Sequence, residues 1–169
     1  MRPRADEVLH SVIATFDEYV APDVTEPFAK SLTLTLSNLM RNVALRIEHE
    51  GQALFDDNQQ LREVLDHVRG YVEASATSRF DSVAKEIADA LERVHVGPGV
   101  YPSLELMTDE ATDLRWALQH SIRALEAARP EFGEAPEYKE LRVRIRRYLR
   151  ASLEREMGLV VPAFTGERR

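Results

Sequence analysis

The sequence contains no cysteine. This absence excludes disulfide bonds, thiolate catalysis, zinc fingers and iron–sulfur clusters, because all of them need the thiol group. No apolar run approaches the roughly 20 residues of a membrane-spanning helix. The first residues, Met1 to Glu7, lack the apolar stretch of a signal peptide. We therefore expect a cytoplasmic protein with no membrane partner.

The motifs of several common enzyme classes are also missing. The chain has no P-loop, no Gly-x-Gly-x-x-Gly dinucleotide motif and no Gly-x-Ser-x-Gly nucleophile elbow. Its 22 lysines and arginines are outnumbered by 29 acids, which gives a net charge of −7. Because nucleic-acid binding needs a basic surface, we expect no nucleic-acid partner.

The 169 residues instead show helical periodicity almost throughout. Apolar residues recur three and four positions apart, which is typical of one face of a helix. Together with Val8 and Val12, a long stripe is expected to face the core: Phe28, Leu32, Leu36, Leu39, Val43 and Ile47. Stripes of the same kind follow from Leu61 onward, and the last helix is expected to bury Tyr138, Leu141, Ile145, Leu149 and Leu153.

Glycine, proline and capping residues divide this periodic pattern into about six helices. Breaks are predicted at Pro22, at Gly51, before Ser78, and over residues 97–102 and 130–136. The run from Asp57 to Gln60 has capping-box spacing and predicts the start of a helix. No segment alternates as a strand would. The sequence thus predicts an all-α, single-domain helical bundle over residues 1–169, with up-and-down neighbours.

Charge is distributed unevenly along this bundle. Residues 1–130 form an acidic body of net charge −9, and residues 136–157 form a basic last helix before a tail at 158–169. Within that helix, residues 139–155 carry seven basic and two acidic side chains. Arg142, Arg146 and Arg150 lie on one helix face and predict a docking stripe for a phosphate-bearing ligand or an acidic protein. The alternative is an internal stripe that neutralises the acidic body.

Two further residues are candidates for partner or ligand contacts. Asn42 lies beside the core stripe, where an amide needs an interhelical hydrogen bond or a ligand. Trp116 is the only tryptophan and falls off the main stripe of its helix. It covers a helix edge or marks an interface, where tryptophan is enriched.

A metal site is a separate candidate. Glu7 and His10, and again Glu92 and His95, form Glu-x-x-His pairs. On a helix, residues three apart share a face, and ferritin-like bundles use two such pairs to bind metal. The four residues could hold iron, manganese or zinc. The alternative is two solvated pairs and no cofactor, because the apolar stripes turn these side chains away from the core.

The beginning of the chain resembles a known family. Residues 2–9, Phe16 and residues 42–50 are similar to an uncharacterised bacterial all-helical family, with a fainter similarity in residues 141–153. Members are often encoded beside aminoglycoside-phosphotransferase-like and acyl-CoA-dehydrogenase-like proteins. The chain differs from that family at Asn38, where a basic residue is expected.

The chain also has a longer middle section than that family, over residues 52–135. The resemblance implies an accessory role near acyl-CoA or phosphotransfer metabolism and supplies no catalytic residues.

The sequence as a whole leaves three hypotheses: a non-catalytic interaction protein that forms a homodimer, a metal-binding ferritin-like enzyme, and a binder of a small acyl or phosphate-containing ligand between helices.

Overall fold

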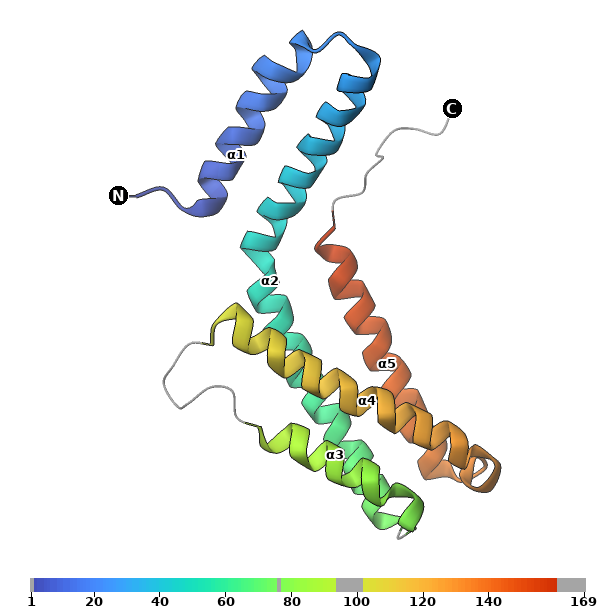
Figure 1. Ribbon diagram of the computed structural model, residues 1–169. Helices are drawn as coiled ribbons and strands as arrows, with labels where there is room; N and C mark the ends of the chain where they lie inside the picture. Colours follow the sequence, from blue (N-terminus) through green and yellow to red (C-terminus); the bar gives the residue numbers. More distant parts are fainter. Residues whose placement is uncertain (1, 76, 94–101, 161–169) are drawn as a thin grey trace. The chain divides into compact units, whose positions relative to one another are not determined.

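The computed structural model describes residues 2–75, 77–93 and 102–160. Every regular element in these ranges is helical, which confirms the predicted all-α class (Figure 1). The long helices are α1 (Ala5–Thr15), α2 (Pro27–Ala74), α3 (Asp81–Glu92), α4 (Leu104–Phe132) and α5 (Pro136–Gly158). A π-helical turn (Phe16–Val20) and a 3-10 turn (Ala21–Asp23) follow α1, and another 3-10 turn (Ser78–Phe80) precedes α3.

The predicted break at Gly51 is wrong, because α2 continues through it for 48 residues. A glycine inside a helix costs only about 1 kcal/mol relative to alanine. The neighbouring residues, Glu50, Gln52, Ala53 and Leu54, favour helix and outweigh that cost. The described part of the chain therefore contains five α-helices rather than six.

The break predicted from residue 130 begins too early, because α4 includes Pro130 and ends at Phe132. A proline in the last turn costs the helix one backbone hydrogen bond. Burial of Ala128 and packing of Phe132 against the core hold this turn in place. Gly133 caps the end of the helix, because its N–H donates to the Arg129 carbonyl at 2.8 Å.

The contacts of the chain gather into two compact units. The first comprises Met1–Ala53 and Glu154–Arg169, and the second comprises Leu54–Leu153. The single domain over residues 1–169, with its acidic body and its tail at 158–169, stays a prediction.

The second unit has a continuous hydrophobic core. Every helix of the unit supplies buried side chains to it: Leu61, Leu65 and Val68 from α2, Ile87 from α3, Leu114 and Leu125 from α4, and Ile145 from α5. The stripes predicted from residue 61 onward are thus confirmed for these helices. Leu104, at the start of α4, and Leu149 and Leu153 on α5 are exceptions, because all three are exposed. Tyr148 is buried instead, since it continues the spacing of Tyr138, Leu141 and Ile145.

The first unit buries far fewer apolar residues. Among its described residues, Ile13 and Ala44 are the hydrophobic side chains that are buried. The stripe from Phe28 to Ile47, predicted to face a core, is exposed instead, and so are Val8 and Val12. The physical reason is that two paired helices bury one face of each and leave the adjacent faces open to solvent. No described helix has the length and hydropathy that crossing a membrane requires.

Candidate functional site

The α1–α2 hairpin of the first unit carries many exposed apolar side chains. Its two helices are antiparallel and are joined by the turns at residues 16–23 (Figure 1). The Ser37 hydroxyl donates to Asp17 Oδ1 at 2.7 Å, and the Arg41 guanidinium forms an ion pair with the same carboxylate. These contacts tie the turn after α1 to the side of α2 that carries Ser37 and Arg41.

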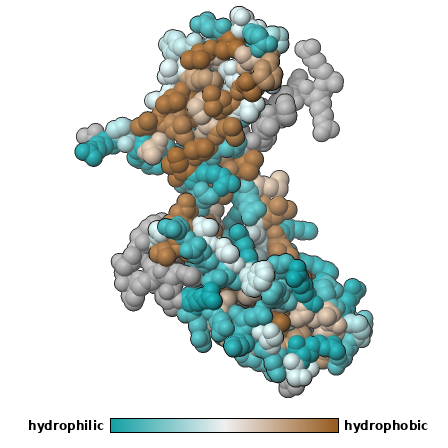
Figure 2. Space-filling model, viewed as in Figure 1, coloured by the Kyte–Doolittle hydropathy of each residue, from teal (hydrophilic) through white to brown (hydrophobic). Residues whose placement is uncertain are grey.

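The exposed stripes flank that contact on the same side of the hairpin. At 3.6 residues per turn, the side of α1 that holds Val8 and Val12 adjoins the side of α2 that holds the long stripe. Figure 2 shows the result as a broad hydrophobic area over α1 and the first half of α2. We call this surface the apolar face and define it by its eight residues: Val8, Val12, Phe28, Leu32, Leu36, Leu39, Val43 and Ile47.

Polar groups in the second unit meet around Asp57, which is only 4% exposed. Asp57 Oδ2 accepts a hydrogen bond from Arg115 Nη2 at 2.9 Å and another from the Tyr148 hydroxyl at 3.2 Å. Burial raises the pKa of Tyr148, and the negative charge of Asp57 raises it further. Burial alone would lower the pKa of Arg115, but the hydrogen bond and charge of Asp57 outweigh burial and raise it. The cluster thus gives a buried carboxylate two hydrogen-bond donors from two other helices.

The neighbouring residue, Asn58, is also buried and connects α2 with α4. Its amide donates to the Met107 carbonyl at 2.8 Å and to the Glu110 carboxylate at 3.3 Å. Arg62 also binds Glu110, and it donates to the Leu91 carbonyl at 2.8 Å and to the Arg93 carbonyl at 3.2 Å. This guanidinium therefore satisfies carbonyls at the C-terminal end of α3.

The prediction that Asp57 starts a helix is wrong, because Asp57 and Asn58 lie inside α2 and point into the core. The local sequence around Asp57 fits the start of a helix with a capping box and equally fits a polar pair inside a helix. The signal that distinguishes them is register, since Asp57 lies four residues before Leu61 and therefore on the core stripe.

The predicted arginine stripe on α5 divides in the structure. Arg142 is turned into the fold, with 18% of its side chain exposed, and forms an ion pair with Glu126 of α4. Arg146 and Arg150 are exposed. One side of the stripe is thus internal and the other faces solvent.

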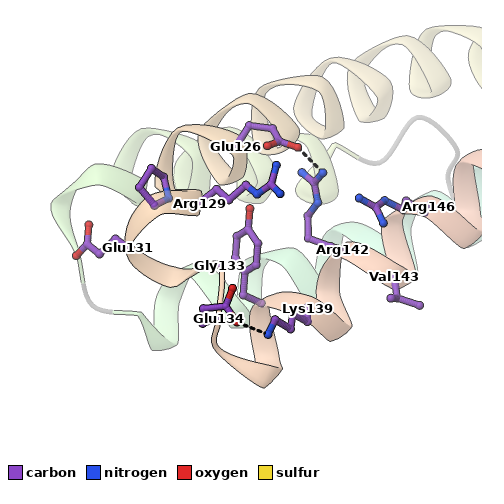
Figure 3. Close-up of a pocket in the computed structure, with 11 residues that line it drawn as sticks. Glu126, Arg129, Glu131, Gly133, Glu134, Lys139, Arg142, Val143 and Arg146 are labelled. Atoms are coloured by element: carbon purple, nitrogen blue, oxygen red, sulfur yellow. Dashed lines mark hydrogen bonds and ion pairs between the residues drawn. The ribbon is translucent and has the colours of Figure 1, made fainter.

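Arg142 and Arg146 also line a pocket between the end of α4 and the start of α5. Its volume is about 860 Å³. Figure 3 shows the guanidinium groups of Arg129, Arg142 and Arg146 facing the space between these helices, with Glu126 beside them. Lys139 and Glu134 form an ion pair at its other end, at 2.7 Å. Among the residues proposed from sequence, Arg142 and Arg146 are the pair that this pocket brings together.

The remaining candidate contact residues lie apart from the pocket lining. Trp116 is exposed on α4, where its ring packs at a tilt against that of His120, with centroids 4.5 Å apart. Asn42 is half-buried on α2 in the first unit.

The metal-site residues have other contacts in the described structure. Glu7 accepts the Arg4 backbone N–H at 3.0 Å, and His10 Nδ1 lies 2.8 Å from the Asp6 carbonyl. Glu92 is exposed at the end of α3, and His95 lies outside the described residues. Within residues 2–75, 77–93 and 102–160, no three histidine or acidic side chains gather in a way that could hold a metal ion.

Comparisons with family models, curated proteins and solved structures found no match to this chain.

Proposed function

We propose that the protein is a non-catalytic interaction protein that works as a homodimer, in which the apolar face of one α1–α2 hairpin pairs with that of a second copy. The observation that carries this proposal is the apolar face itself. Phe28, at 70% exposure, is its most exposed residue, although the sequence pattern is that of a buried stripe. Such an apolar patch on a soluble chain marks an interaction site.

The size of the apolar face suits a dimer. Its eight side chains together expose on the order of 800 Å² of surface, and a standard interface buries about 800 Å² per partner. A second hairpin placed on this face would complete a four-helix arrangement, in which each helix buries a stripe against its neighbours. In a dimer with a two-fold axis, the apolar face of each copy covers that of the other, so a single interface buries both.

The charges near the apolar face favour a second copy over a charged partner. Arg41 is paired with Asp17 across the hairpin, and Arg46 is paired with Glu50 along α2. These arginines are thus neutralised within their own hairpin. The partner's surface then needs to be apolar, and an identical hairpin offers that surface.

The cytoplasm is the compartment we propose for this dimer. The chain has no cysteine and therefore cannot form the disulfide bonds that are typical of small proteins in oxidising compartments. Its net charge of −7 favours protein or small-molecule partners over nucleic acid. The accessory role implied by the sequence resemblance is compatible with a dimer that presents two copies of the second unit.

Sedimentation velocity on the full chain tests the proposal. We expect wild-type protein at about 10 µM to sediment at twice the chain mass of 19.2 kDa. The double variant Leu32→Glu/Leu39→Glu places charges in the middle of the apolar face and should weaken dimerisation at least about 100-fold, since a buried charge without a partner is costly.

Leu34→Glu is the matched control. Leu34 is 67% exposed, but helix periodicity places it on the opposite side of α2 from the stripe. This variant should remain a dimer, and circular dichroism should show that both variants stay helical. A wild-type chain that sediments at 19.2 kDa up to about 100 µM would refute the proposal, as would equal dissociation by Leu34→Glu.

A further inference from the structure

We propose that the pocket between α4 and α5 binds a small organic ligand through a phosphate group, with Arg129, Arg142 and Arg146 as the residues that hold it. All three line the pocket (Figure 3). The pocket lies entirely within Leu54–Leu153, whereas the apolar face lies in the other unit. The proposal therefore does not depend on the dimer.

The first argument is the balance of charge in the pocket. Two of its three carboxylates are occupied by other cations, since Glu134 pairs with Lys139 and Glu131 pairs with Arg79 at 3.3 Å. Glu126 pairs with Arg142, and Arg129 adds a weaker electrostatic contribution at Glu134 behind that of Lys139, so the three guanidinium groups share little negative charge. Like charges gathered in a concave site repel one another, and a bound anion relieves that repulsion.

The second argument is the unused hydrogen-bonding capacity of these arginines. Glu126 binds Nη2 of Arg142, while its buried Nη1 has no hydrogen-bond partner in the described part of the chain. In the same described ranges Arg146 forms no ion pair, and Arg129 acts on Glu134 only as a second charge behind the Lys139 ion pair. A guanidinium presents five donors in a planar fork, and a phosphate group offers several acceptor oxygens that match it.

The third argument concerns the kind of molecule that carries the phosphate. A volume of about 860 Å³ is within the range of small-molecule pockets, roughly 300–1,000 Å³, and exceeds the need of a bare phosphate. Pro130, Tyr138 and Val143 supply apolar wall. The Tyr138 hydroxyl already donates to the Leu125 carbonyl at 2.9 Å, so its ring acts as a wall. An organic body would pack there while the arginines hold the phosphate.

Isothermal titration calorimetry on the full chain, at low salt, tests this proposal with three probes. We expect phenyl phosphate to bind, inorganic phosphate to bind at least tenfold more weakly, and phenol to show no binding. Raising the salt concentration should weaken phenyl phosphate binding, because the contact is ionic.

Variants assign the binding to the pocket. Arg146→Gln removes an exposed pocket arginine and leaves the Arg142–Glu126 ion pair in place, so the fold should persist while the Kd for phenyl phosphate rises at least tenfold. Arg142→Gln should raise the Kd further. Arg147→Gln removes the same charge from an exposed position of α5 outside the pocket lining, and it should leave the Kd unchanged.

Three results would overturn the proposal. The first is that phenyl phosphate does not bind wild-type protein at millimolar concentration. The second is that Arg147→Gln weakens binding as much as Arg146→Gln, which would indicate a diffuse effect of the basic helix. The third is equal affinity for inorganic phosphate and phenyl phosphate, which would leave the organic part of the ligand without a role. None of these results bears on the mass of the dimer, so the two proposals fail separately.

Discussion

The hydroxyl of Tyr148 donates a hydrogen bond to the carboxylate of Asp57, at 3.2 Å and across 91 positions of the sequence. Arg115 binds the same carboxylate oxygen at 2.9 Å. One buried oxygen thus links α5, α4 and α2. A buried carboxylate is tolerated only where such partners compensate for lost hydration. This geometry makes Asp57 the position in the second unit where a change of charge should matter most.

Asp57→Asn should lower the free energy of unfolding by about 2–3 kcal/mol, somewhat less than the 3–5 kcal/mol typical when a fully buried pair is broken. The cost is expected to be smaller because the Arg115 side chain is 46% exposed and can be hydrated once the carboxylate is gone. Tyr148→Phe should cost about 1 kcal/mol, the usual net value of one hydrogen bond. Urea unfolding followed by circular dichroism measures both. Glu63→Gln, on the exposed side of the same helix, is the control and should change stability by less than about 0.5 kcal/mol.

The raised pKa of Tyr148 predicts a loss of stability at alkaline pH. Burial and the charge of Asp57 favour the protonated phenol in the folded state. The unfolded chain releases that proton near pH 10.0, while the folded chain retains it to higher pH. The contribution is therefore fully present below about pH 10 and is lost as pH rises through the raised folded pKa.

Urea unfolding of wild type and Tyr148→Phe between about pH 8 and pH 11 tests this slope. The pKa of Tyr71 is also raised, chiefly by burial, and its contribution is common to both proteins. The wild-type free energy of unfolding should decline more steeply than that of Tyr148→Phe. Parallel curves would mean that Tyr148 titrates alike in both states.

Two glycines should respond in opposite directions to alanine. Nothing lies within 4 Å of the position that a Cβ of Gly51 would occupy, so Gly51→Ala should stabilise α2 by about 0.5–1 kcal/mol. A Cβ at Gly133 would lie 2.5 Å from the Arg129 carbonyl oxygen, which accepts the Gly133 N–H. Gly133→Ala must therefore distort the α4–α5 turn and should lower the melting temperature. Thermal unfolding of the two variants provides the comparison, and a stabilised Gly133→Ala would contradict this turn geometry.

The local sequence pattern predicted most of the helices but not which helix faces pack against one another. Stripes such as Leu61 to Val68 were identified correctly because each apolar face meets another helix of its unit. The same periodicity predicted burial for Leu32 and Leu39, which are exposed. Period identifies which face of a helix is apolar, but it carries no information about what covers that face.

The candidate site shows the same division. Arg142 and Arg146 could be chosen from sequence because basic residues concentrate on one helix face. Their pocket could not, because it needs Arg129 and Glu126 from α4, and no local pattern encodes that approach. Asp57 was missed for a different reason, since its neighbours satisfy the spacing of a capping box as well as that of a buried position.

The role of Arg62 at the end of α3 gives a local prediction. Its guanidinium reaches the carbonyls of Leu91 and Arg93 and the carboxylate of Glu110 together. A lysine is a single point charge and cannot hold three such acceptors in one plane. Arg62→Lys should therefore lower the free energy of unfolding by about 1–3 kcal/mol. We expect α3 to unfold locally before the rest of the unit.

Hydrogen exchange with mass spectrometry can locate that effect. Amides of α3 should exchange faster in Arg62→Lys, while those in the middle of α4 stay protected, because Leu114 and Leu118 are buried there independently of Arg62. The matched control is Arg69→Lys, whose ion pair with Asp66 lies on the exposed side of α2 at 2.9 Å and whose loss should be nearly silent. If Arg62→Lys left exchange in α3 unchanged, as the control should, solvent would have to satisfy the carbonyls at the end of α3. The Arg62 contacts would then not stabilise the helix.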